Sequence, residues 1–347
     1  LPPRKETYAY MHTVADKVLE RAGSGDMTEE EAYHIRYGVY HEDMHTEAFS
    51  YTRQTLGYPP PAGLLEYTGR TRTKEDIGGG PYPGDARIPG GTYMLGAPKD
   101  EPFAFDNEKW AHPVEIEPFS IAKAPVTQAE FAEFVDDGGY RKETLWSGDG
   151  WRWRAEDDSG HPVHWRPAGG GWERRNFDEW VPLEPHKPVI HVCFHEAEAY
   201  CRWAGRRLPT EAEWELAASG EPGDTGGFTE RKRRYPWGDE PPTPERANLD
   251  WHHMGCVDVG AFPKGDSAFG CRQMIGNLWE WTSSVFAPFP GFVVDPYKDY
   301  SEPWFYSRRV LRGGAWPTRS RLIRNLYRNY FTPERKDVWS GFRTCAL

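Results

Sequence analysis

The sequence predicts an α+β fold in which two N-terminal helices precede a larger domain of short strands, turns and short helices. Aromatic residues make up 15% of the 347 residues, and 36 glycines and 31 prolines interrupt the chain. This composition is typical of many turns joined by aromatic packing, and it excludes a mostly helical protein. The aromatic content also excludes a disordered chain, because disordered segments are poor in aromatic residues.

Charge and cysteine usage exclude several classes of protein. The formal net charge is −11, which argues against nucleic acid and against an anionic membrane as partners. No run of about 18 apolar residues is present, so we expect no membrane span, and the N-terminal residues lack a signal segment. The five cysteines are odd in number and scattered, which favours a reducing compartment over a disulfide scaffold. We therefore expect a cytoplasmic protein.

The N-terminal part is predicted to contain two helices. Apolar residues recur at helical spacing over residues 6–22. Thr28 and Glu31 form a capping-box pattern for a second helix over residues 29–56. Two helices alone bury little apolar surface, so we expect them to pack against further elements. Prolines and glycines then mark residues 59–87 as a linker.

The rest of the chain alternates short apolar runs with turns, which predicts strands. Thr127 is placed to cap one short helix, and Thr210 with Glu213 makes a capping box for another. The expected short helices cover residues 128–136, 196–203 and 210–219. The predicted organisation is a helical part over residues 1–58, a linker over 59–87 and an α+β domain over 88–347.

Two histidines on the second predicted helix are candidate metal ligands. His41 and His45 are four residues apart, so they share one helical face. Neutral imidazoles in this arrangement suit iron, zinc, copper or nickel. The alternative is that both are ordinary histidines of the surface or the core. His34 lies on the same face but about 10 Å away along the helix, too far to share one ion easily.

The segment from His41 to His45 also matches the H-E-x-x-H pattern of zinc proteases. In that alternative Glu42 is the general base, and a third ligand follows downstream. No second HxxGxxH element is present, and a proline-rich stretch comes instead. The two histidines do not complete a site by themselves, since catalytic metals usually keep three protein ligands and an open position.

A series of ordered blocks runs from residue 89 to the C-terminus: PGGTYMLG (89–96), KAPVTQAEFAEFV (123–135), KPVIHVCFHEAEAYCRWAGRRLPTEAEWELAA (187–218), YPWGDE (235–240), GNLWEWTSS (276–284), RVLRGGAW (309–316) and SGFRTCA (340–346). Together the blocks resemble the formylglycine-generating-enzyme-like (sulfatase-modifying-factor) domain. The resemblance implies a C-type-lectin-like α+β fold with little regular structure. Formylglycine-generating enzymes bind copper through a cysteine pair shortly after the RGG block, but residues 318–331 contain no cysteine. This departure argues against that oxidase activity.

The order of an HxxxH helix, a proline-rich linker and this domain resembles the ergothioneine-type sulfoxide synthases and the selenoneine synthases. The resemblance implies a DinB-like four-helix bundle before the lectin-like domain and a mononuclear non-haem iron centre. It implies that Fe(II) is held by three histidines, two of which match His41 and His45. The third belongs to the first bundle helix, so we expect it, with two helices, to lie upstream of Leu1. The implied chemistry uses O2 to join a chalcogen donor to C2 of the imidazole of hercynine.

The same resemblance implies roles for residues nearer the C-terminus. Tyr297 and Tyr300 match the family's tyrosine pair, of which the first donates or relays a proton; a phenol is both donor and acceptor. Asn329 matches a residue that contacts the carboxylate or betaine end of hercynine. Tyr330 is expected to present its ring to the quaternary ammonium in a cation–π contact. The alternative is that these tyrosines are ordinary core aromatics.

Two departures from the family pattern concern the donor. Members that use γ-glutamylcysteine carry Gln where this chain has Met44, and Asp where it has Phe331. Phe331 cannot replace Asp as a partner for a donor's ammonium group. Arg335 matches the arginine that binds a donor carboxylate, and it suits another polar donor as well. The segment around these residues resembles the selenoneine-synthase branch, whose donor is a selenosugar.

The preferred hypothesis is an enzyme that forms a carbon–selenium bond on hercynine with Fe(II), O2 and a selenosugar donor, at a site between the two domains. One alternative is carbon–sulfur bond formation with a cysteine or γ-glutamylcysteine donor, as in ergothioneine biosynthesis. An alternative from another class is a non-catalytic, lectin-like module that binds a ligand. All three hypotheses imply small-molecule partners.

Overall fold

The computed structural model describes residues 2–61, 78–158, 160–224 and 226–347. The chain divides into two compact units, Leu1–Ala48 (unit 1) and Phe49–Leu347 (unit 2). Much of the expected linker lies outside the described residues. No helix in the described part of the chain is both long enough and apolar enough to cross a membrane.

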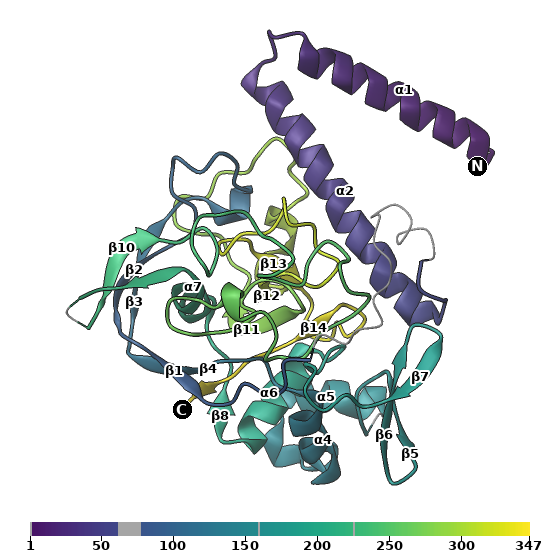
Figure 1. Cartoon of the computed structure of the whole chain (residues 1–347), viewed down its shortest axis with the longest axis vertical. Coiled ribbons are helices and arrows are strands. Elements are labelled where there is room, and N and C mark those ends of the chain that lie inside the picture. Colours follow the sequence, from purple (N-terminus) through teal and green to yellow (C-terminus); the bar gives the residue numbers. More distant parts are fainter. Residues whose placement is uncertain (1, 62–77, 159, 225) are drawn as a thin grey trace. The chain divides into compact units, whose positions relative to one another are not determined.

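Unit 1 consists of α1 (Arg4–Gly23) and most of α2 (Glu29–Leu56), which confirms both predicted N-terminal helices (Figure 1). The predicted capping box is present, because Glu31 N–H donates to Thr28 Oγ1 at 3.2 Å and Thr28 N–H donates to the Glu31 carboxylate at 2.8 Å. Arg21 also binds the Glu31 carboxylate, at 2.7 Å. One carboxylate therefore holds the turn between the helices.

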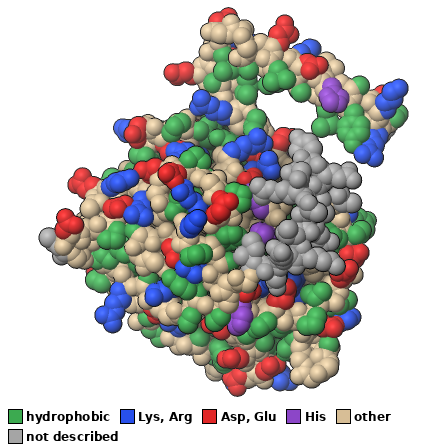
Figure 2. All heavy atoms as spheres, viewed as in Figure 1, with side chains coloured by type: hydrophobic (Ala, Val, Ile, Leu, Met, Phe, Trp, Pro, Cys, Tyr) green, Lys and Arg blue, Asp and Glu red, His purple; other side chains and the backbone are tan. Residues whose placement is uncertain are grey.

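The helix α1 buries none of its side chains. Its apolar residues stay exposed, with 71% of Tyr10 and 69% of Leu19 accessible, and Figure 2 shows hydrophobic side chains along it. An apolar stripe on a helix normally packs against another element. The described residues contain these two helices of the expected bundle and no others, so the DinB-like architecture stays a prediction.

Unit 2 is built from short strands in several sheets, as expected of an α+β domain with little regular structure. One four-stranded sheet has the order β1-β4-β15-β8, with the bounds Asp85–Ile88, Phe119–Ala122, Cys345–Ala346 and Arg206–Arg207. The other has the order β13-β12-β11-β14, with the bounds Asn329–Phe331, Arg309–Arg312, Trp279–Val285 and Ser340–Gly341.

Smaller sheets and helices complete unit 2 (Figure 1). The smaller sheets join β2 (Gly91–Leu95) to β3 (His112–Ile116), β9 (Gly220–Pro222) to β10 (Phe228–Lys232), and β6 (Gly171–Asn176) to both β5 (Trp165–Ala168) and β7 (Glu179–Pro182). The α-helices are α4 (Gln128–Asp136), α5 (Gly148–Asp157), α6 (Phe194–Trp203) and α7 (Glu211–Ser219). Single turns of 3-10 helix are η1 (Asp106–Glu108), η2 (Gly139–Arg141), η3 (Glu143–Leu145), η4 (Pro263–Gly265) and η5 (Glu302–Trp304).

The three predicted short helices are confirmed as α4, α6 and α7. Thr127 caps α4 as expected, and Glu130 completes a capping box that was not predicted there. The predicted capping box at Thr210 starts α7. The helix α6 begins two residues before its predicted start, because the Glu196 carboxylate accepts the backbone N–H of Cys193 and makes that residue the N-cap. The helix α5 was not predicted; the Ser147 side chain caps it.

The interior of unit 2 contains large aromatic and charged side chains together. Five tryptophans and three arginines are among the largest fully buried side chains: Trp214, Trp279, Trp281, Trp316, Trp339, Arg312, Arg328 and Arg343. Buried arginines are rare unless they are paired, so the unit depends on internal ion pairs as well as on aromatic packing. All five cysteines are buried free thiols, which confirms that no disulfide scaffold is present.

Candidate functional site

The two candidate metal ligands lie on one face of α2, as predicted. The ring centroids of His41 and His45 are 4.5 Å apart, and the ring of Tyr37 stacks on His41 at 5.7 Å. Partial burial lowers the pKa of His41, and the neighbouring His45 adds to this effect. A lowered pKa keeps the imidazole neutral, which is the form that binds a metal ion. The pair therefore fits two ligand positions of one ion.

A third candidate metal ligand beside this pair is not found in the described part of the chain. No cluster of three or more His, Cys, Asp or Glu side chains suited to a metal occurs among the described residues. His34 lies two turns before His41 on the same helix, and its Nε2 is 3.9 Å from the carboxylate of Glu30. Met44 lies next to His45 and one turn after His41, where it can border an ion that the pair holds.

Three tyrosines of unit 2 form a compact cluster around Tyr300. The hydroxyl of Tyr300 is 3.4 Å from that of Tyr327, and the Tyr330 hydroxyl donates to the Tyr300 carbonyl. The ring of Phe105 packs on Tyr300 with centroids 4.7 Å apart. The structure therefore brings together Tyr300 and Tyr330, two of the residues that the sequence singled out, although 29 residues lie between them in the chain.

Burial controls the acid–base state of this cluster. It raises the pKa of Tyr300 well above the ordinary value, and Tyr327 and Tyr330 raise it further. The pKa of Tyr330 is raised for the same reason, with Tyr327 again adding to burial. Both phenols are therefore neutral near pH 7 and serve as hydrogen-bond donors. Tyr297 lies nearby in the chain; 39% of its surface is accessible, and its carbonyl accepts the Tyr300 N–H at 3.4 Å.

Asn329 and Tyr330 lie on the edge strand β13. They stand opposite Leu311 and Val310 of β12 in an antiparallel pair. The side-chain carbonyl of Asn329 accepts the Tyr330 N–H at 2.9 Å. The ring of Phe286 stacks on Tyr330 with centroids 3.9 Å apart. Phe286 thus covers one face of Tyr330, and the ring of Tyr300 lies near Tyr330 in an edge arrangement, with centroids 6.1 Å apart.

Arg335 lies near two aromatic rings and is already paired with a carboxylate. Its guanidinium is 4.9 Å from the ring centroid of Phe331 and 5.6 Å from that of Tyr51, which belongs to the last turns of α2. Two of its nitrogens donate to the Asp337 carboxylate. Asp337 was not predicted as a functional residue. The sequence shows only that an acidic residue stands two positions after Arg335. The pairing offsets the charge that would attract an anionic donor.

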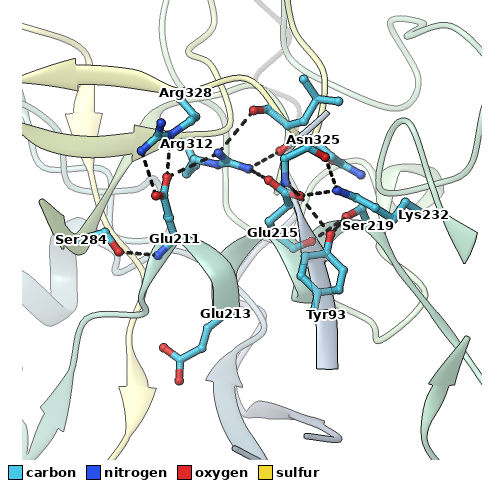
Figure 3. Close-up of polar contacts among 12 residues, drawn as sticks. Tyr93, Glu211, Glu213, Glu215, Ser219, Lys232, Ser284, Arg312, Asn325 and Arg328 are labelled. Atoms are coloured by element: carbon cyan, nitrogen blue, oxygen red, sulfur yellow. Dashed lines mark hydrogen bonds and ion pairs between the residues drawn. The ribbon is translucent and has the colours of Figure 1, made fainter. Parts of the chain in front are cut away.

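Two buried ion pairs join α7 to β12 and to the residue before β13, the strand that carries Asn329 and Tyr330. Figure 3 shows Glu211 and Glu215 of α7 pointing towards Arg328 and Arg312, whereas Glu213 points away from them. Arg328 donates to both carboxylate oxygens of Glu211 at 2.9 Å. Arg312 at the end of β12 binds Glu215. The helix α7 thereby anchors both β12 and the residue that precedes β13.

Comparison with known proteins gives two groups of relatives. The model of the sulfatase-modifying factor enzyme 1-like domain matches residues 73–346. A Mycolicibacterium smegmatis protein named hercynine oxygenase is 38% identical over 99% of this chain and 78% of its own length. Another of that name, from Mycolicibacterium thermoresistibile, is 45% identical over 70% of this chain, but the match spans only 54% of its own length. A formylglycine-generating enzyme of Streptomyces coelicolor is 34% identical over 76% of this chain.

Proposed function

The chain belongs to the sulfatase-modifying factor enzyme 1-like domain family, and from this premise we propose that it is an oxygenase that acts on hercynine. The observation that carries the proposal is the match to a protein named hercynine oxygenase over 99% of the chain, because that match extends beyond the family domain to α2 and its histidine pair. The second relative of that name supports the same substrate.

We propose that His41 and His45 are two ligands of an Fe(II) ion. Their rings lie on one helical face with centroids 4.5 Å apart, and the lowered pKa of His41 favours the neutral, metal-binding form. Imidazole is a common ligand of iron in oxygen-using enzymes, usually with a third protein ligand. Bound iron supplies positions for O2 and for the donor's selenium or sulfur.

The residues of unit 2 are proposed to bind hercynine and to provide a proton. Tyr330 offers the ring face opposite Phe286 to the quaternary ammonium, which cannot form hydrogen bonds and is attracted by a π face. Asn329 offers its side-chain amide to the carboxylate end of the substrate. Tyr297 is proposed as the proton donor, because it is exposed, whereas Tyr300 is half-buried and its side chain contacts Tyr327 and Phe105.

The donor is proposed to be an uncharged selenosugar. Arg335 is engaged by Asp337, and Phe331 covers one side of its guanidinium. Phe331 and Met44 have no charge with which to bind the ammonium or carboxylate of an amino-acid donor. The alternative is carbon–sulfur bond formation with cysteine or γ-glutamylcysteine as the donor. Oxygen uptake measured with each donor distinguishes the selenium and sulfur reactions.

The test is reconstitution of the full-length protein with Fe(II) under anaerobic conditions, followed by oxygen-electrode measurements. Hercynine is supplied with 1-selenoglucose, cysteine or γ-glutamylcysteine in separate reactions. We expect oxygen uptake that requires hercynine and is fastest with the selenosugar. Fastest uptake with a thiol donor would establish the sulfur alternative. Hercynine binding without uptake for any donor would contradict the enzyme proposal and favour a lectin-like binding module.

Variants of α2 test the metal proposal separately. His41→Ala and His45→Ala each remove one proposed ligand and should lose both bound iron and oxygen uptake. His34→Ala is the matched control, since this histidine lies two turns from His41 and interacts with Glu30. Iron content measured by mass spectrometry distinguishes loss of the metal from loss of a later step. Full iron content in both ligand variants would refute the assignment.

A further inference from the structure

The segment that carries Tyr297 and Tyr300 is held at both ends by one buried carboxylate. Asp106 in η1 is only 1% exposed. Its carboxylate accepts the hydroxyl of Ser301 at one end of the segment and the backbone N–H of Asp295 at the other, at 3.4 Å. Tyr297 and Tyr300 both lie in the sequence between these two contacts.

The neighbours of Asp106 strengthen the same two attachments. The Asn107 side chain donates to the Ser301 hydroxyl at 2.9 Å. The Lys109 ammonium binds the Asp295 carboxylate at 2.6 Å. Residues 106–109 therefore contact both ends of the tyrosine segment, 295–301. Arg328 in turn donates to the Asn107 carbonyl at 2.6 Å, which ties this stretch to the residue before β13.

We infer that Asp106 is a positioning residue that holds segment 295–301 in place and so sets the positions of Tyr297 and Tyr300. The functional part of this inference rests on the proposed function, because it takes Tyr297 as the proton donor. The structural part stands on the contacts alone. Asp106 acts through the segment and contacts neither tyrosine side chain in the described hydrogen bonds and ion pairs.

A carboxylate at position 106 can hold both ends of segment 295–301 better than an amide can. The two oxygens of Asp accept bonds from Ser301 and from Asp295 at the same time, whereas Asn has one accepting oxygen and one donating nitrogen. No Lys or Arg within the described residues pairs with Asp106. Burial raises the pKa of Asp106, opposed by the Ser301 hydroxyl and assisted by the Asp295 carboxylate. Asp106→Asn therefore removes the buried charge without opening a cavity, and its neutral amide binds the Ser301 hydroxyl and the Asp295 N–H less strongly than the carboxylate does.

The experiment is hydrogen–deuterium exchange on the full-length protein, followed on a peptide that covers segment 295–301. In Asp106→Asn we expect exchange of this segment to rise about tenfold or more, the amount that loss of one charge-assisted hydrogen bond allows. Ser301→Ala should act similarly, and the double variant should add little, since both remove the same contact. Asp299→Asn is the control, because its side chain lies exposed within the same segment. Unchanged exchange in Asp106→Asn, or a rise spread evenly over β11 and β12, would overturn the inference.

Steady-state kinetics tests the functional part. With hercynine as the varied substrate, Asp106→Asn should lower kcat by about tenfold while KM changes less, because the proton donor moves, whereas the pairing of β13 with β12 still holds Asn329 and Tyr330. An unchanged kcat together with faster exchange would overturn the positioning role. Absence of oxygen uptake in the wild type would instead overturn the proposed function, and the exchange result would still test the structural part.

Discussion

Glu215 is the residue whose substitution tests the buried polar network most sharply. Its carboxylate is fully buried and binds Arg312 and Lys232, the latter at 2.6 Å. Glu215→Gln keeps the shape of the side chain but removes its charge, so the buried Arg312 loses its nearest carboxylate. Arg312 ends β12, whose preceding residues pair with Asn329 and Tyr330. The substitution therefore also weakens the support of the proposed substrate residues.

The size of the effect follows from the pKa of Glu215. Burial raises this pKa, but Lys232 and Arg312 outweigh burial and lower it from the ordinary 4.5 to about 2. Such a shift corresponds to about 3 kcal/mol of folding stability at neutral pH. Because the folded-state pKa is depressed, the stability is complete above about pH 4.5 and is lost as the pH falls towards 2, leaving about 1.4 kcal/mol at pH 3.

The assay is urea unfolding of the full-length protein, followed by tryptophan fluorescence at about pH 7 and about pH 3. Glu215→Gln should lose about 3 kcal/mol relative to wild type at pH 7 and about 1.4 kcal/mol at pH 3. Glu230→Gln, on the exposed side of β10, is the matched control and should unfold like the wild type at both values. An equal loss at both pH values, or no loss at pH 7, would show that the charge of Glu215 does not stabilise the fold in this way.

Three further predictions concern the proposed substrate residues. Tyr330→Leu should weaken hercynine binding by about tenfold in calorimetry, whereas Tyr330→Phe keeps the ring and should bind nearly as well; equal losses in both variants would exclude the cation–π contact. Tyr297→Phe should lower oxygen uptake by about 100-fold or more without changing the melting temperature, since its side chain is partly exposed; a normal rate would remove it as the proton donor. Asp337→Asn should free Arg335 and lower KM for donors with a carboxylate, with no gain for an uncharged donor; unaltered donor preference would contradict the pairing argument.

Local signals explain which helices could be predicted from the sequence. The capping box of Thr28 and Glu31 marks the start of α2, and the helical period then places His41 and His45 on one face. N-capping threonines at positions 127 and 210 likewise predicted the starts of α4 and α7. The helix α5 escaped prediction because glycines at positions 148 and 150 lower helix propensity in its first turn. Ser147 alone is a weak start signal.

Contacts between distant parts of the chain explain what the sequence could not show. Asp106 and Ser301 are 195 residues apart, and no periodicity in either neighbourhood indicates that they meet. The parallel pairing of β11 with β14 also joins distant parts of the chain, and no local sequence pattern indicates it. The resemblance to a family indicated Tyr300 and Tyr330, but the contact between them depends on β12 and β13 pairing. Sequence patterns thus identified candidate residues, and the tertiary structure supplied their neighbours.

We propose that this protein uses O2 to replace the hydrogen at C2 of the hercynine imidazole with a chalcogen. Proton NMR of hercynine during the reaction measures this most directly, because the C2 proton gives its own signal. We predict that the signal disappears only when the Fe(II)-loaded protein, O2 and a donor are all present, and that it persists in the His41→Ala variant. A C2 signal of undiminished intensity while O2 is consumed would show that the protein does not form a bond at this carbon.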